Sequence, residues 1–79
     1  MKLTVYSLNG VEFQGEVEAF NVKTQIGEIT VLDKHRPLVT VLAKGVAKII
    51  KHDGSVETKE VNSGFLEVMP GSRVDALVN

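Results

Sequence analysis

The fold of this 79-residue chain is decided by the stretch Val11–Val22, whose sequence is VEFQGEVEAFNV. In its first half, apolar residues at positions 11, 13 and 17 alternate with polar ones, as in a strand with one buried face. In its second half, Phe20 and Val22 move the apolar residues to even positions. This change indicates a bulge or bend near residues 18–19, which lets one stretch of chain serve two sheets.

On both sides of this stretch the sequence continues as short strands. Asn9-Gly10 and Asp53-Gly54 are hairpin signals, and further Gly and Pro residues divide the rest. No stretch between these breakers has a helical period, while the apolar run Leu38–Leu42 is typical of a strand buried on both faces. The pattern predicts an all-β fold of about nine short strands and no helical domain. We expect residues 1–79 to form a single domain, a two-sheet β-sandwich or flattened barrel.

The composition excludes several classes of protein. An apolar content of 43% argues against disorder, and the absence of Cys excludes disulfides and thiolate chemistry. A small domain without disulfides indicates the cytosol. Apolar runs are no longer than Ala76-Leu77-Val78, so we expect neither a membrane span nor a secretion signal. A net charge of −1 argues against a dedicated nucleic-acid binder.

The charges are unevenly spread along the chain. Residues 34–52 carry basic side chains and no acid, whereas the acidic Glu12, Glu16 and Glu18 share one strand parity earlier. Two interpretations remain open for the basic stretch: solvated strand faces, or a basic edge that meets an acidic partner. The basic residues of this stretch are Lys34, Arg36, Lys44, Lys48 and Lys51.

A search for catalytic patterns predicts no catalytic residue, no metal ligand and no cofactor. His35 and His52 stand far apart and have no neighbouring His or Cys. Ser63-Gly64 lacks the spacing of a nucleophile elbow, and no glycine-rich phosphate loop is present. The three carboxylates at 12, 16 and 18 are expected to face solvent, whereas acid–base catalysis by paired carboxylates needs burial.

Two segments stand out for binding rather than chemistry. Residues 27–38 form a strand that ends in a charged loop before Pro37, which suits the first residue of the next strand. The second is the segment Gly64–Val68, GFLEV, in which Glu67 shares parity with Phe65. Glu67 is therefore either partly buried and hydrogen-bonded or turned toward a partner.

These residues resemble a known family, the epsilon subunit of F-type ATP synthases, over Leu3 to about Leu77. Its landmarks arrive in order and in register across this part of the chain. They are Phe13-x-Gly15-x-Val17, Gly27-Glu28, His35-x-Pro37-Leu38-Val39-Thr40, Gly45-Val46 and Gly64-Phe65-Leu66-Glu67-Val68. The chain departs from the family at Asp33-Lys34, where Pro-Gly is usual, and at Thr30, Arg36 and Ser63.

The resemblance implies a β-sandwich of about ten strands and a non-catalytic place in the rotating central stalk. Such a subunit links the gamma subunit to the polar loops of the membrane c-ring and so couples proton translocation to ATP synthesis. It implies a c-ring-facing set: Gly27, Glu28 and Lys34. It also implies a gamma-facing set: Ser7, His35, Pro37, Leu38, Val39 and Thr40.

The same resemblance places the chain at the cytoplasmic face of a bacterial inner membrane, attached only through the complex and without nucleic acid. The family's C-terminal helical hairpin would begin near Asn79, so we expect either a truncated chain or a natural short form. The alternatives are a free-standing β-sandwich that binds a protein, peptide or carbohydrate, and an enzyme.

Overall fold

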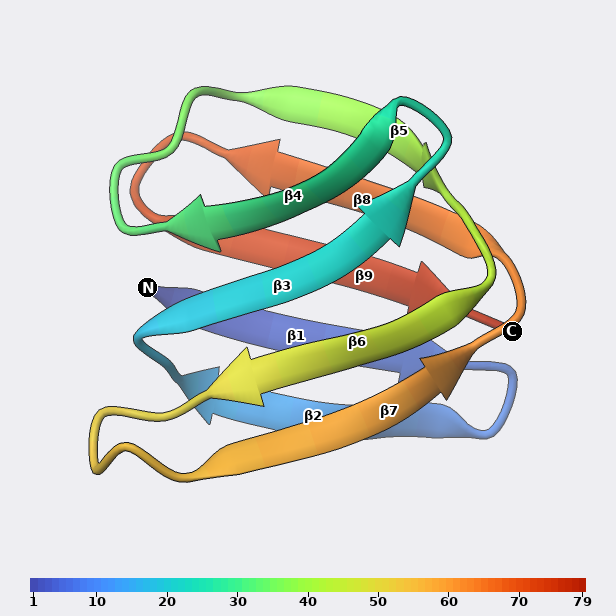
Figure 1. The fold of residues 1–79 in the computed structure, drawn as a ribbon. Coiled ribbons are helices and arrows are strands. Elements are labelled where there is room, and N and C mark those ends of the chain that lie inside the picture. The colour runs from blue at the N-terminus through green and yellow to red at the C-terminus, as the bar shows by residue number, and fades with distance from the viewer.

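A computed structural model describes residues 1–79 as nine β-strands (Figure 1), where the resemblance implied about ten. It contains no helix of the length and hydropathy that a membrane crossing requires. The all-β expectation is confirmed. The strands are β1 (Lys2–Ser7), β2 (Gly10–Glu16), β3 (Ala19–Thr24), β4 (Gly27–Leu32), β5 (Leu38–Leu42), β6 (Gly45–Ile50), β7 (Val56–Val61), β8 (Gly64–Met69) and β9 (Arg73–Val78).

The strands form one curled sheet that folds into two facing layers. Hydrogen-bonded neighbours follow the order β2-β1-β9-β8-β5-β3-β6-β7, with β4 on the other side of β3. The join between β5 and β3 is a single residue pair, Thr24 with Leu42. We therefore call β2-β1-β9-β8-β5 sheet I and β4-β3-β6-β7 sheet II; sheet II lies in front in Figure 1.

The expected switch between sheets near residues 18–19 is confirmed. The Val17 amide donates to the Met1 carbonyl at 2.9 Å beside sheet I, and the next amide, Glu18, donates to Ile50 in sheet II at 2.8 Å. A second irregularity was not expected. The register of β1 and β2 shifts between Val5 and Tyr6, so a bulge at Glu12 turns Val11 to the outer face.

The core lies between the inner faces of the two sheets. Phe20, Leu3 and Leu66 are among its fully buried side chains. The parallel pairing of β1 with β9 places the first and last strands side by side in the middle of sheet I. The expectation that Leu38–Leu42 is buried on both faces is wrong, because nothing covers the outer face of β5 and Val39 is 70% exposed there.

The loops at the two ends of the sandwich differ in how many charged side chains they carry. We call the end at the right of Figure 1 the C-terminal end; it carries Asn79, the uncharged turns Leu8-Asn9 and Gln25-Ile26, and the Ala43-Lys44 connection. The opposite, N-terminal end carries Met1 and the charged loops 33–37 and 51–55. Strands of five to seven residues separate these ends, which corresponds to about 20 Å.

Candidate partner-binding faces

An unbroken row of apolar side chains crosses the outer face of sheet I. Cross-strand pairing brings Tyr6 beside Leu77, Leu77 beside Phe65 and Phe65 beside Val41. The bulge in β2 adds Val11 opposite Tyr6, so the row spans all strands of the sheet. Phe65 is 56% exposed and Leu77 is 50% exposed. We call these residues the apolar row; apolar surface of this extent on a small protein marks an interaction site.

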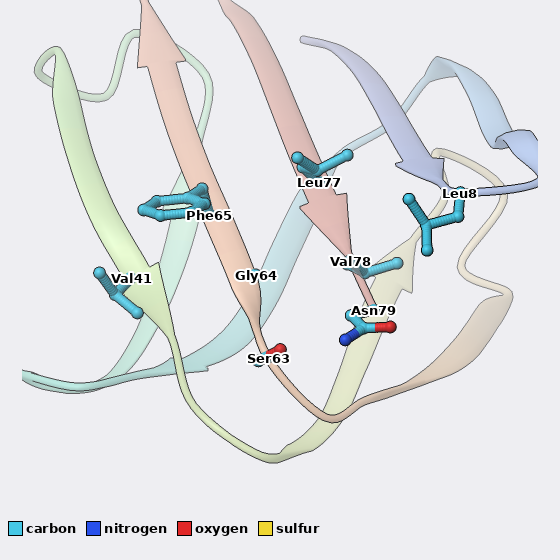
Figure 2. Close-up of a pocket in the computed structure, with 8 residues that line it drawn as sticks. All are labelled: Leu8, Val41, Ser63, Gly64, Phe65, Leu77, Val78 and Asn79. Carbon is cyan, nitrogen blue, oxygen red and sulfur yellow. The ribbon is translucent and has the colours of Figure 1, made fainter.

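The apolar row continues into an open hollow of about 420 Å³ at the C-terminal end (Figure 2). Phe65, Leu77 and Val78 line it, and Leu8 adds a side chain from the β1–β2 turn that is 92% exposed. Gly64 lies at its base in a backbone conformation with φ of 150°, where an added Cβ would lie 1.9 Å from the Leu77 carbonyl oxygen. The hollow therefore extends the same apolar surface and is not a separate enclosed pocket.

Two carboxylates lie directly beside the apolar row. Glu67 on β8 pairs with Asp75 on β9, one position further along the same outer face. None of the ion pairs in the structure includes either residue. Of the two readings of Glu67, the buried one is wrong, since its side chain is exposed beside Phe65.

The residues predicted to face gamma are spread along sheet I and its β5 edge. Ser7 ends β1 at the C-terminal end, where its hydroxyl donates to Glu12 at 2.8 Å. His35 and Pro37 lie at the opposite end, and Val39 is exposed on the outer face between them and the row. The side chains of Leu38 and Thr40 instead share the inner side with Val68 and Leu66, their partners on β8.

The residues predicted to face the c-ring are separated by the structure. Gly27 and Glu28 begin β4 at the C-terminal end, just after the exposed Ile26. The Glu28 carboxylate accepts a hydrogen bond of 3.0 Å from the Asn21 amide. Lys34 follows the far end of β4, so the length of this strand lies between Lys34 and Glu28.

The loop that holds Lys34 keeps the shape of a Pro-Gly turn. The His35 amide donates to the Leu32 carbonyl at 3.1 Å, and Lys34 has a φ of 64°, as the third residue of a type II turn requires. The Ser72 hydroxyl hydrogen-bonds Asp33 and lowers the pKa of this carboxyl below its usual value of 3.8. The departure from the family's Pro-Gly therefore leaves the turn intact.

The charged stretches of the sequence do not form charged patches. The interpretation of residues 34–52 as one basic edge is wrong. Lys34 lies at one end of the sandwich, Lys44 lies at the other, and Lys48 lies on the outer face of sheet II. The three early carboxylates also separate. Glu12 meets Ser7, Glu16 lies 3.5 Å from the N-terminal ammonium, and Glu18 lies 2.9 Å from His52.

No set of three His, Cys, Asp or Glu side chains lies close enough to share a metal ion. His52 Nδ1 is engaged by Glu18, and His35 Nδ1 lies 2.7 Å from the Arg36 carbonyl oxygen.

A second, shorter apolar row crosses the outer face of sheet II at the N-terminal end. Ala19 pairs with Leu32 on one side and with Ile50 on the other, and Ile50 pairs with Val56. Leu32 and Val56 are each 54% exposed. Leu32 therefore matches Leu77 in residue type and exposure but lies on the opposite face.

Sequence reasoning missed the apolar row on sheet I. Its members come from separate strands, and only Phe65 lies in a segment that the sequence singled out, Gly64–Val68. The signal that was available is the strand alternation: Phe65 and Leu77 have opposite parity to the buried Leu66 and Ala76 beside them. Only the pairing of the strands shows that these outward residues adjoin.

Comparison with known proteins gives the same fold and one family. The family described as "ATP synthase, Delta/Epsilon chain, beta-sandwich domain" matches residues 1–79. The ATP synthase epsilon chain of Shouchella clausii is 41% identical over 70 residues, which are 89% of this chain and 52% of that protein.

Two solved structures are similar to this chain. One is a chain in the cryo-EM structure of the Euglena gracilis mitochondrial ATP synthase, described as OSCP/F1/c-ring in rotational state 1. It matches with a TM-score of 0.91 and 27% identity over 96% of this chain and 48% of that one. The other belongs to the central stalk/c-ring structure of the Tetrahymena thermophila mitochondrial ATP synthase. It has a TM-score of 0.79, 19% identity and coverage of 99% and 62%, and it shows the fold alone. The chain thus spans about half the length of its curated relative.

Proposed function

Because this chain belongs to the β-sandwich family of the ATP synthase delta and epsilon chains, we propose that it is a non-catalytic rotor subunit of an F-type ATP synthase. It links the gamma subunit to the c-ring in the central stalk and couples proton translocation to ATP synthesis. The observation that carries this proposal is the exposed apolar row on sheet I, which needs a protein partner to cover it. The chain then lies at the cytoplasmic face of the bacterial inner membrane, held there by the complex.

We assign the outer face of sheet I to the gamma subunit. A stable interface takes roughly 800 Å² from each partner, about a sixth of this chain's surface of 4780 Å². The face that we assign runs from Ser7 at one end to Pro37 at the other. Phe65 and Tyr6 supply the exposed aromatic anchors that carry most of the energy in such interfaces.

We assign the β3–β4 turn at the C-terminal end to the polar loops of the c-ring. Gly27 and Glu28 belong to this contact, with the exposed Ile26 between the two strands. Lys34 is left out of it, because Lys34 lies at the opposite end of the sandwich. The chain therefore meets its two partners through an end and a face rather than through one surface.

Binding to the cognate gamma subunit tests the proposal, with Leu77→Ser compared against Leu32→Ser. Burying the exposed half of a leucine is worth about 1–1.5 kcal/mol, so Leu77→Ser is expected to weaken the complex about tenfold. Leu32→Ser, equally exposed on sheet II, is expected to change the Kd less than about twofold. Calorimetry with purified proteins measures both, and melting curves of the free chains report any loss of folding.

Two results would contradict the proposal. The first is the absence of a wild-type complex at micromolar concentration, which would mean that the gamma subunit is not a partner of this chain. The second is a complex that Leu32→Ser weakens and Leu77→Ser leaves unchanged, which would move the gamma contact to sheet II.

A further inference from the structure

We propose that Glu67 and Asp75 form an acidic pair that receives a lysine or arginine side chain of the partner docked on the apolar row. This inference rests on the proposed function and deepens it, because it states the chemistry that the gamma surface must present. The two carboxylates lie opposite one another on β8 and β9, in the position next to the Phe65–Leu77 pair.

The free chain leaves this pair without a cation. Like charges directly opposite on neighbouring strands destabilise a sheet. The ion pairs that do form involve Met1, Lys51, Lys59 and His52, and none reaches Glu67 or Asp75. Two cations share the same outer face one position further along: Arg73, which pairs with Met69, and Lys2, which pairs with Arg73. Neither makes an ion pair with Glu67 or Asp75. A cation from outside would therefore be the first to offset the repulsion between the two carboxylates.

The surroundings of the pair specify where that cation must be. The residues paired with the two carboxylates on the flanking strands are uncharged. Val39 on β5 pairs with Glu67, and Thr4 on β1 pairs with Asp75. The apolar row lies two residues away along each strand, a distance of about 7 Å. A partner helix that packs apolar side chains on Phe65 and Leu77 reaches the acidic pair with a side chain three or four residues further along, since one helical turn rises about 5.4 Å.

The pair also sets which partners fit. Docking covers both carboxylates, and a covered charge without an opposite charge opposes binding. An apolar or acidic residue at that place in the partner is therefore disfavoured, whereas a basic residue is favoured and fixes the position of the partner along the strands. The apolar row supplies affinity, and the acidic pair supplies the selection of the partner.

The test uses the double variant Glu67→Gln/Asp75→Asn, which keeps the shape of both side chains and removes their charge. We expect it to bind the cognate gamma subunit about tenfold more weakly at 50 mM NaCl, with a smaller loss of affinity as NaCl rises to 300 mM. Glu60→Gln, an exposed carboxylate on sheet II without an ion pair, is the control and should leave both the Kd and its salt dependence unchanged.

The free double variant gives an independent readout. Because it loses a repulsion, its melting temperature should equal or exceed that of the wild type. A clear fall in melting temperature would mean that the carboxylates support the fold and would overturn the inference.

The binding outcomes separate this inference from the proposed function. A wild-type complex whose affinity and salt dependence are unchanged in the double variant overturns the acidic pair and leaves the proposed function standing. The absence of any wild-type complex overturns the proposed function and this inference with it.

Discussion

Among single residues, Gly64 has the least freedom to change. An added Cβ would lie 1.9 Å from the Leu77 carbonyl oxygen, and the φ of 150° is one that other residues rarely adopt. We expect Gly64→Ala to lower the free energy of unfolding by about 3 kcal/mol. In a domain of this size that corresponds to a fall in Tm of more than about 12 °C, which calorimetry measures.

Gly45→Ala is the matched control for Gly64→Ala. At Gly45 an added Cβ would meet Lys23 Cδ at 2.6 Å, but this is the far part of a flexible side chain that can move away. We expect a change within about 1 kcal/mol. Equal losses for the two variants would contradict the backbone clash at Gly64.

A substitution at Glu28 is expected to impair function without lowering the stability of the fold. Its exposed side chain makes one hydrogen bond, with Asn21. We expect Glu28→Ala to change the free energy of unfolding by about 0.5 kcal/mol or less and to weaken proton-coupled ATP synthesis in the assembled enzyme. Glu60→Ala, on the face of sheet II, is the control and should change neither; a large fall in Tm for Glu28→Ala would make the residue structural.

At the scale of elements, β7 is an edge strand whose charges cover the open side of the sandwich. Glu57 lies 3.2 Å from Lys51 and 3.5 Å from Lys59, and Lys51 lies over the Phe13 ring at 5.6 Å. The hydrogen bond from Lys51, reinforced by the charge of Lys59, lowers the pKa of Glu57 below its usual value of 4.5. Charged side chains of this kind also protect an edge strand from pairing with another chain.

The lowered pKa predicts how acid acts on this strand. Because the folded pKa of Glu57 lies below the unfolded value of 4.5, its contribution to stability is present above pH 4.5 and is lost as the pH falls through the folded pKa. The difference in Tm between wild type and Glu57→Gln should therefore shrink between pH 6 and pH 3. A difference for Glu57→Gln that stays constant over this pH range would refute the ion pair.

Some properties of the elements followed from the sequence, and others did not. Alternation and turn residues predicted the strands and the switch near residues 18–19, because burial of one strand face is a local pattern. The bulge at Glu12 was missed, since one extra residue between two paired strands leaves no mark on composition. The run Leu38–Leu42 was misread because exposure of β5 depends on which layer covers it, and the sequence does not state this.

The predicted sites also depend on how the strands are arranged in space, which the sequence pattern does not show. Lys34 was grouped with Glu28 because the resemblance implied one c-ring-facing set, but the chain between them is extended as β4 and carries them to opposite ends. The apolar row was missed for the converse reason: its members are distant in sequence and adjacent only through strand pairing.

At the scale of the whole molecule, sheet I needs both ends of the chain. β9 lies between β1 and β8, so without it the sheet would divide into a β2–β1 pair and a β8–β5 pair. We expect a chain that ends at Ser72 to show no cooperative thermal transition and little amide protection. The control is a full chain with two glycines inserted at the Leu8-Asn9 turn, which should fold because exposed hairpin tips tolerate insertion. A cooperative transition in the shortened chain would contradict this dependence on β9.

The narrow join between the two sheets has a mechanical consequence. Close to the β3–β4 turn, the sheets are bridged by the Gln25 amide bound to Val41 at 3.0 Å and the Ala43 amide bound to Lys23 at 2.9 Å. A lateral force on that turn is passed to sheet I through these two hydrogen bonds. Both bonds are loaded in shear at the same time, and the packed core resists the same displacement. These two hydrogen bonds lie close to the β3–β4 turn, so a force applied at the turn acts on them over a short lever arm. The sandwich therefore transmits the force as a rigid body and does not bend at the join between the two sheets.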